Sequence, residues 1–177
     1  YDEATADKLA REKGWVFKWD ARGGYRRVVP SPEPVGIIEL DAIRLLIKEG
    51  FIPITVGGGG IPVVVDSGID GIEAVIDKDL ASQVLANAIN ADYLLILTDT
   101  DYVYLNYRKP NQKRLVEMTI DEAKRYYEEG QFPPGSMGPK VLAAIRFVKN
   151  GGKAAYIGPL GRAKDILRGI VGSRIVK

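Results

Sequence analysis

A chain of 177 residues suffices for one compact domain or two small lobes, since domains usually run to ~100–200 residues. Cysteine and histidine are both absent, which excludes disulfide scaffolds, thiol nucleophiles, Cys/His zinc sites and imidazole bases. The 25 basic and 23 acidic residues nearly balance, so the charge predicts no nucleic-acid or membrane partner. A metal would bind through carboxylate and phosphate oxygens, which favours Mg²⁺ over zinc.

The ends of the chain give no targeting signal. The first residues are acidic and no apolar h-region follows them, so we expect no signal peptide. The longest uncharged stretch, residues 50–65, holds five glycines and two prolines, so it predicts no membrane-spanning helix. An initiator methionine is lacking, and we expect either a removed front or a longer parent chain.

The first third of the chain predicts a small lobe and a linker. Residues 2–13 predict a polar helix, and residues 15–19 an aromatic strand. A basic turn with Arg22, Arg26 and Arg27 follows; it fits an RNA-binding patch or an ordinary surface turn, and we expect the surface turn. Three prolines within residues 30–34 predict an extended linker, because proline cannot pair in a ladder and disfavours helix before it.

The middle of the chain predicts a helix, a strand and a hairpin around a glycine run. Residues 37–49 form an amphipathic pattern that a glycine ends. The apolar run at residues 51–56 has the length of a strand and stops at four glycines. Residues 63–65 and 71–76 then predict a hairpin.

The remaining residues predict alternating helices and strands. We expect helices over residues 80–91, 120–130, 139–150 and 163–168, strands over 93–97 and 153–157, a hairpin of 102–107 with 114–118, and a terminal edge strand over 172–177. Thr119 and Glu122 predict a capping box. Residues 93–97 are apolar at every position, which is typical of a parallel strand buried on both faces.

This alternation predicts a three-layer α/β/α fold with a mostly parallel central sheet. Such sheets bind ligands beyond the carboxyl ends of their strands. The expected ligand segments are therefore residues 57–60, 98–101 and 158–161.

The glycine run is the first candidate site. Gly57, Gly58, Gly59 and Gly60 follow a strand pattern and can present backbone N–H groups to an anion. They match neither a Walker A loop nor a dinucleotide fingerprint, and a flexible turn is the alternative. Four glycines cost roughly 0.5–1 kcal/mol each relative to alanine, which favours the anion site.

Two lysines stand at predicted helix starts. Lys78 lies between Asp77 and Asp79, and Lys140 follows the loop of residues 135–139. A cation at a helix N-terminus is mildly unfavourable, whereas the aspartates suit ordinary capping. Two lysines in this unusual position are explained if both reach toward a phosphate. Three tyrosines, Tyr102, Tyr104 and Tyr107, predict hairpin packing, with an adenine contact as the alternative.

Several motifs together resemble the carbamate kinases of the amino-acid kinase family, to which acetylglutamate kinase is related. They are GYRRVVPSP (24–32), GGGGIPV (57–63), VIDKDLAS (75–82), LILTD (95–99) and GSMGPK (135–140). They occur in order over essentially the whole chain, but cover only the carboxyl-terminal portion of the family's polypeptide. A first glycine-rich loop and a further lysine of the family are missing.

The resemblance implies roles for individual residues. Lys78 and Lys140 match lysines on the nucleotide phosphates and the transferred group, and Asp79 matches the aspartate that orients them. Gly57, Gly58, Gly59 and Gly60 match a loop near the acceptor and the transferred phosphoryl group. Residues matched to the nucleotide-binding part are Asp77, Thr98, Asp99, Asp101, Tyr107, Met137 and Gly138; no residue is matched to a metal.

The resemblance also implies an activity and an organisation. The expected reaction moves the γ-phosphoryl group of ATP to carbamate, giving carbamoyl phosphate, or runs in reverse with ADP, with Mg²⁺ as the metal. Residues 1–30 would be the tail of a protruding lobe, 31–66 the end of the acceptor-side domain and 67–177 the nucleotide-binding domain. A cytoplasmic homodimer in arginine metabolism is implied, completed by a missing N-terminal half. A sister kinase with another acceptor and an inactive ATP/ADP-binding module are the alternatives.

Overall fold

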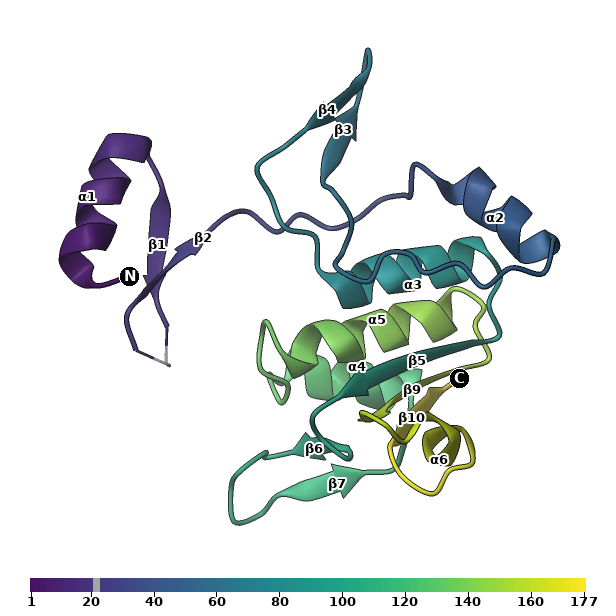
Figure 1. Ribbon diagram of the computed structural model, residues 1–177. Coiled ribbons are helices and arrows are strands. Elements are labelled where there is room, and N and C mark those ends of the chain that lie inside the picture. Colours follow the sequence, from purple (N-terminus) through teal and green to yellow (C-terminus); the bar gives the residue numbers. More distant parts are fainter. Residues whose placement is uncertain (21–22) are drawn as a thin grey trace. The chain divides into compact units, whose positions relative to one another are not determined.

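The computed structural model describes residues 1–20 and 23–177, in two compact units. The first unit is Tyr1–Pro32 with Ile61–Val75, and the second is Glu33–Gly60 with Ile76–Lys177 (Figure 1). Arg22 of the expected basic turn lies outside the described residues.

The first unit holds one helix and two antiparallel strand pairs. Helix α1 (Glu3–Lys13) is capped by Asp2 and followed by β1 (Val16–Trp19) and β2 (Tyr25–Val28), as the amino-terminal pattern predicts. The expected hairpin also forms, from β3 (Val63–Val65) and β4 (Ile69–Gly71). Its return strand starts earlier than expected because Val65 pairs with Ile69 directly across the turn.

Both described arginines of the basic turn have carboxylate partners within this unit. Arg26 lies 2.5 Å from Asp20. Arg27 pairs with Glu73, and its guanidinium carbon lies 3.8 Å from the ring centroid of Trp15. These contacts fit a surface turn.

A four-stranded mixed sheet organises the second unit. Its order is β5 (Tyr93–Thr98), β9 (Ala154–Pro159), β10 (Ser173–Val176) and β8 (Glu117–Thr119). β5–β9 and β10–β8 are parallel, whereas β9–β10 is antiparallel. The expected α/β class is confirmed. The expectation that residues 172–177 form an edge is wrong, because β10 has a partner on each side.

Helices cover both faces of this sheet, giving three layers (Figure 1). Helix α5 (Met137–Lys149) packs on the strands, and α3 (Lys78–Ala88) and α4 (Ile120–Glu128) pack against it. The short α6 (Ala163–Leu167) packs on β9 from the other side. The capping box of α4 forms as expected. The largest fully buried apolar side chains are Phe147, Met118, Ile157, Ile166, Ile175, Val103, Val141 and Val148.

The strand expected over residues 114–118 is divided in two. β7 (Lys113–Leu115) pairs with β6 (Val103–Leu105), whereas β8 pairs with β10. The division follows from these different partners. The buried Ser173 hydroxyl links β10 to the β6–β7 hairpin, since it accepts from the amide of Val103 at 2.8 Å and donates to the carbonyl of Leu115 at 2.5 Å.

β5 is not buried on both faces, contrary to the expectation. Leu94 and Ile96 lie in the core, whereas Tyr93 and Leu97 are exposed. The reason is that α3 and α5 contact β5 on one face, while α6 contacts β9.

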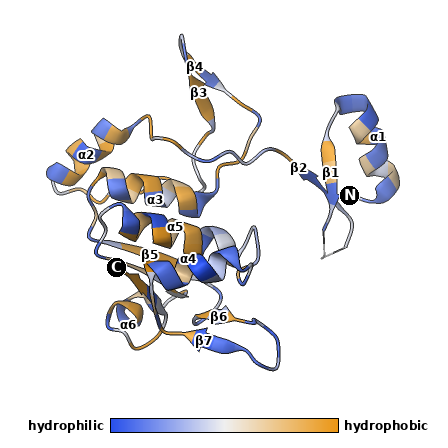
Figure 2. Ribbon diagram, turned by 180° about the vertical axis from the view of Figure 1, so that it is seen from behind, coloured by the Kyte–Doolittle hydropathy of each residue, from blue (hydrophilic) through white to orange (hydrophobic). Residues whose placement is uncertain are grey.

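Residues 51–56 form no strand, so that expectation is also wrong. A strand needs a hydrogen-bonding partner, and none of the described strands pairs with this segment. The preceding helix α2 (Leu40–Lys48) shows apolar bands in Figure 2 and has only Ile43 buried. Arg44 donates to the carbonyl of Ala88 at 2.7 Å and thereby holds α2 to the end of α3.

Candidate functional site

Helices α3 and α5 lie parallel, with their N-termini at the same end. The Lys140 ammonium contacts Oδ2 of Asp79 at 2.7 Å near these N-termini. At the other end, Nδ2 of Asn87 donates to the carbonyl of Phe147 at 3.1 Å. The positive ends of two helix dipoles therefore meet at the Asp79–Lys140 pair, which favours an anion there.

The two helices start in different ways. Asp77 caps α3, because its Oδ1 accepts from the amides of Asp79 at 2.8 Å and Leu80 at 3.1 Å. No side chain caps α5 at Ser136. The amide of Gly138 bonds to the carbonyl of Pro133 at 2.9 Å, and a Cβ at Gly138 would lie 3.1 Å from that oxygen. The missing side chain thus permits the tight entry into α5.

The Asp79–Lys140 ion pair is nearly buried, with 10% and 13% of the side chains exposed. Since two helix N-termini oppose a cation at this point, Asp79 is needed to hold the ammonium in place. Lys78 precedes Asp79 on α3 and is exposed. Its ammonium makes no hydrogen bond or ion pair to any described residue. One lysine of the expected pair is therefore fixed, and the other is free to reach a ligand.

A polar connection runs along the same face of α3. Gln83 lies four residues after Asp79 and donates to Asn87 at 2.7 Å. Asn87 in turn bonds to the Phe147 carbonyl. Because buried polar groups need matched partners, these hydrogen bonds fix the register of α3 against α5. The sequence analysis did not single out Gln83 or Asn87. The available signal was the repeat of polar residues every four positions after Asp79, which places them on one face of the helix.

The glycine run lies next to the N-terminus of α3. Gly59 is buried, and a Cβ there would overlap the carbonyl oxygen of Ile76, the residue before Asp77. Gly57 and Gly58 are exposed, and an added Cβ would meet nothing within 4 Å. The structure therefore brings the predicted acceptor loop to the start of the helix that carries Lys78 and Asp79.

The expected ligand segment after β5 lies at the carboxyl end of the strand. Thr98 accepts a backbone bond from Leu160 at 2.9 Å, so the loops after the parallel strands β5 and β9 lie together as expected. The Thr98 hydroxyl donates to Asp99 at 3.2 Å. The hydroxyl of Thr100 is buried and has no partner among the described residues. Such a group costs ~1–3 kcal/mol, so Thr100 is a candidate ligand contact that the predicted set omitted.

Asp101 and the tyrosines form a neighbouring cluster. The Tyr104 hydroxyl donates to Asp101 at 2.7 Å, and this hydrogen bond, with desolvation, raises the pKa of Tyr104 to about 12. The Tyr104 ring centroid lies 6.4 Å from that of Tyr102 and 5.8 Å from that of Tyr107. The rings pack on one another, as hairpin packing predicts.

Met137 is the first residue of α5 and packs against the core. Among the described residues, no hydrogen bond or ion pair joins the segment from Thr98 to Tyr107 to the Asp79–Lys140 pair. The predicted residues thus fall into three groups: the ion pair with Asp77, the glycine run beside it, and the segment after β5.

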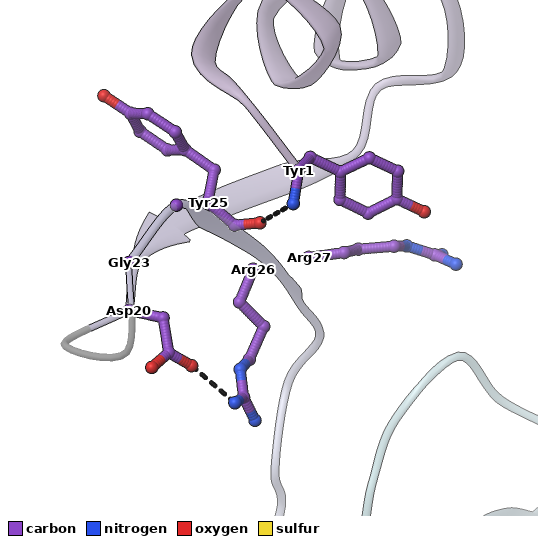
Figure 3. Close-up of a pocket in the computed structure, with 7 residues that line it drawn as sticks. Tyr1, Asp20, Gly23, Tyr25, Arg26 and Arg27 are labelled. Atoms are coloured by element: carbon purple, nitrogen blue, oxygen red, sulfur yellow. Dashed lines mark hydrogen bonds and ion pairs between the residues drawn. The ribbon is translucent and has the colours of Figure 1, made fainter.

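The first unit has a pocket of its own (Figure 3). It is lined by Tyr1, Asp20, Gly23, Gly24, Tyr25, Arg26 and Arg27. Arg26 pairs with Asp20 inside the pocket, Arg27 pairs with Glu73 outside its lining, and the amino group of Tyr1 donates to the carbonyl of Tyr25 at 2.8 Å. It contains none of the predicted site residues.

Two further properties concern the described part of the chain. Residues 1–20 and 23–177 contain no group of three or more carboxylates that could hold a metal ion. They also contain no helix with the length and apolar character needed to cross a bilayer.

Comparison with known proteins gives a consistent result. The model of the amino acid kinase family matches residues 4–159. The carbamate kinase of Thermococcus kodakarensis is 54% identical over 178 residues, covering 100% of this chain and 56% of the relative. That of Thermoplasma acidophilum is also 54% identical, covering 100% of this chain and 58% of the relative.

A solved structure agrees with these relatives. The carbamate kinase of Giardia lamblia bound to AMP-PNP is 44% identical and superposes with a TM-score of 0.89, covering 100% of this chain and 57% of the other. The chain thus spans somewhat more than half the length of the proteins it matches, and the resemblance inferred from the motifs is confirmed. The chain belongs to the amino acid kinase family.

Proposed function

We propose that the polypeptide carrying this chain is a carbamate kinase, which transfers the γ-phosphoryl group of ATP to carbamate or runs in reverse from carbamoyl phosphate and ADP. The observation that carries the proposal is the Asp79–Lys140 pair at the shared positive end of α3 and α5. The 54% identity to proteins named carbamate kinase supports the choice of acceptor.

The chemistry requires positioning and charge neutralisation more than covalent help. A carbamate oxygen is already a nucleophile, so the reaction needs no general base and no histidine. Lys140, held by Asp79, faces the transferred phosphoryl group, and the unpaired Lys78 closes on the same phosphates. An ammonium ~4 Å from a phosphate oxygen contributes ~4 kcal/mol at an effective dielectric constant near 20.

The other predicted residues bind the two substrates. Gly57, Gly58, Gly59 and Gly60 approach the acceptor, since they lie next to the start of α3. Residues for the nucleotide are Asp77, Thr98, Asp99, Asp101, Tyr107, Met137 and Gly138. The relative that binds AMP-PNP supports nucleotide use, and the unpartnered Thr100 hydroxyl offers a further contact.

Mg²⁺ would arrive with the nucleotide. Mg²⁺ in such sites is typically bound by substrate phosphates, waters and one or two carboxylates. Asp99 is the exposed carboxylate nearest in sequence to the end of β5. When bound, the ion would offset negative charge on the nucleotide phosphates.

The remaining part of the polypeptide completes the enzyme. Val35, Ile52 and Ile54 are almost fully exposed here, and burying such side chains stabilises by ~1.5–3 kcal/mol each. This chain spans 56% and 58% of the two relatives, so a further 44% and 42% of their chains is available to cover these side chains. In this arrangement residues 1–30 belong to a protruding lobe, 31–66 to the acceptor-side domain and 67–177 to the nucleotide domain. The resemblance further supports a cytoplasmic homodimer in arginine metabolism.

A coupled assay that forms ATP from carbamoyl phosphate and ADP tests the proposal in the full-length polypeptide. Lys140→Ala should lower turnover by ~10²–10³, the loss typical of one electrostatic group at a transition state, with the circular dichroism spectrum unchanged. Lys149→Ala is the matched control, because Lys149 is exposed at the last turn of the same helix. Turnover of Lys140→Ala near that of the control would contradict the assigned role.

The same assay separates the alternatives. We expect the 177-residue chain alone to bind ADP without turnover, because the acceptor side is incomplete; full activity from these residues would refute that expectation. A full-length polypeptide that binds ADP but does not use carbamoyl phosphate would instead be a sister kinase with another acceptor.

A further inference from the structure

The four consecutive glycines are not equivalent. Gly59 and Gly60 have positive φ angles of +95° and +83°, which side-chain-bearing residues rarely adopt. Gly57 and Gly58 lie outside that region. The backbone therefore requires glycine at the second pair only.

The run begins with a strained turn. The amide of Gly59 bonds to the carbonyl of Val56 at 3.0 Å, so Gly57 and Gly58 are the central residues of a β-turn. Val56 has a φ of 50°, an unfavourable angle for a β-branched residue. Strain of this kind persists where surrounding contacts hold it, and it is common at ligand sites.

The turn comes very close to the start of α3 at Gly59. Gly59 is buried, and any Cβ there would overlap the carbonyl oxygen of Ile76. The next residue, Asp77, caps α3 through the amides of Asp79 and Leu80. The glycine turn and the first turn of α3 therefore meet across a gap too small for a methyl group.

We propose that Gly59 is a positioning residue, whose contact with the Ile76 carbonyl sets the distance between the glycine turn and the start of α3. The inference rests on the proposed function, because it makes this distance the spacing between the acceptor and the phosphoryl-binding lysines. Gly57 and Gly58 need no glycine for backbone or internal packing, and their open side leaves room for the acceptor.

Three alanine substitutions in the full-length polypeptide test the role of Gly59. Gly59→Ala introduces both the unfavourable φ and the overlap with Ile76. Gly60→Ala introduces a similar φ strain with nothing within 4 Å. Gly50 follows α2, has a φ of +83° and has nothing within 4 Å of an added Cβ. Gly50→Ala therefore introduces the same φ strain at a position outside the glycine run.

We expect Gly59→Ala to lower turnover with carbamoyl phosphate about 100-fold, the effect of a displacement of roughly 1 Å, and to raise the KM for carbamoyl phosphate. Its calorimetric affinity for ADP should fall far less than its turnover, because the side-chain ion pair of Asp79 with Lys140 lies outside the overlap. Gly60→Ala should lose less activity, and Gly50→Ala should keep the parent activity. Equal losses of turnover in Gly59→Ala and Gly60→Ala, or equal fold-losses of ADP affinity and turnover in Gly59→Ala, would overturn the proposal.

If the proposed function is wrong, the unmutated full-length polypeptide will itself show no turnover with carbamoyl phosphate, so this failure is distinguishable from a failure of the inference about Gly59. Hydrogen exchange then tests the contact by itself. Gly59→Ala should speed exchange at the amides of Asp79 and Leu80 as well as in residues 57–60, whereas Gly60→Ala should affect residues 57–60 alone. Unchanged exchange at Asp79 and Leu80 in Gly59→Ala would disprove the contact's role.

Discussion

Residues 76–177 and residues 33–60 belong to the same compact unit, but they differ in how far their apolar side chains are buried. Phe147 and Ile157 are fully buried in the first region, whereas Ile52 is 93% exposed in the second. The residue types are similar, and what differs is the presence of partners: β5 pairs with β9 over six residues, while residues 51–56 pair with no described strand. An apolar run in the sequence thus indicates side chains that favour burial, but they are buried only where another strand or helix packs against them.

The largest expected effect is the loss of unfolding free energy when a core side chain is truncated. Phe147→Ala in the 177-residue chain should lower the free energy of unfolding by ~3–5 kcal/mol, since it leaves a cavity under α5. Phe51→Ala makes the same change in the other region, and we expect a shift within ~0.5 kcal/mol because its side chain is 64% exposed. Urea denaturation measures both; similar losses would show that Phe51 is packed.

A second prediction concerns the exposed face. Ile52→Ser with Ile54→Ser should reduce self-association of the 177-residue chain and leave its unfolding free energy unchanged. In the full-length polypeptide the same pair should cost ~1.5–3 kcal/mol per side chain, if the rest of the polypeptide covers them. Light scattering and urea denaturation measure the two effects. Equal stability of the full-length parent and variant would argue against a covered face.

The smallest effect concerns the ion pair that ties the two regions together. Arg146 donates to both carboxylate oxygens of Glu33, at 2.8 and 3.0 Å, and lowers the pKa of Glu33 below its ordinary value. A depressed pKa means that the pair stabilises the chain above the ordinary Glu pKa, and that this contribution is lost as the pH falls through the lowered value.

An NMR titration of Glu33 checks this behaviour. Arg146→Gln should return the pKa of Glu33 toward its ordinary value, whereas Arg125→Gln, on the exposed face of α4, should leave it unchanged. An unshifted Glu33 in the parent would mean that the pair does not persist in solution.

Local signals in the sequence predicted the second unit well. Thr119 and Glu122 predicted the start of α4 because a capping box involves only neighbouring residues. Strand pairing was less accessible: β10 is internal because it pairs with the distant β8 as well as with β9, and residues 114–118 are divided because β7 pairs with the nearby β6 whereas β8 pairs with β10. Periodicity describes an element by itself and carries no information on which strand lies beside it.

The candidate site shows the same limit. The unusual lysines at helix starts were visible locally, but the bond between Asp79 and Lys140 joins residues 61 positions apart. The close approach of Gly59 to Ile76 and the unpartnered Thr100 hydroxyl depend on how loops pack. The type of a residue therefore suggested its chemistry, while its role within the site needed the fold.

The two ends of the α3–α5 pair are fastened by different chemistry, Lys140 with Asp79 at one end and Asn87 with Phe147 at the other. Contacts at both ends oppose splaying of the two helices, so we expect α3 and α5 to move together. Changes of shape in this unit should then fall on the loops that flank the two helices.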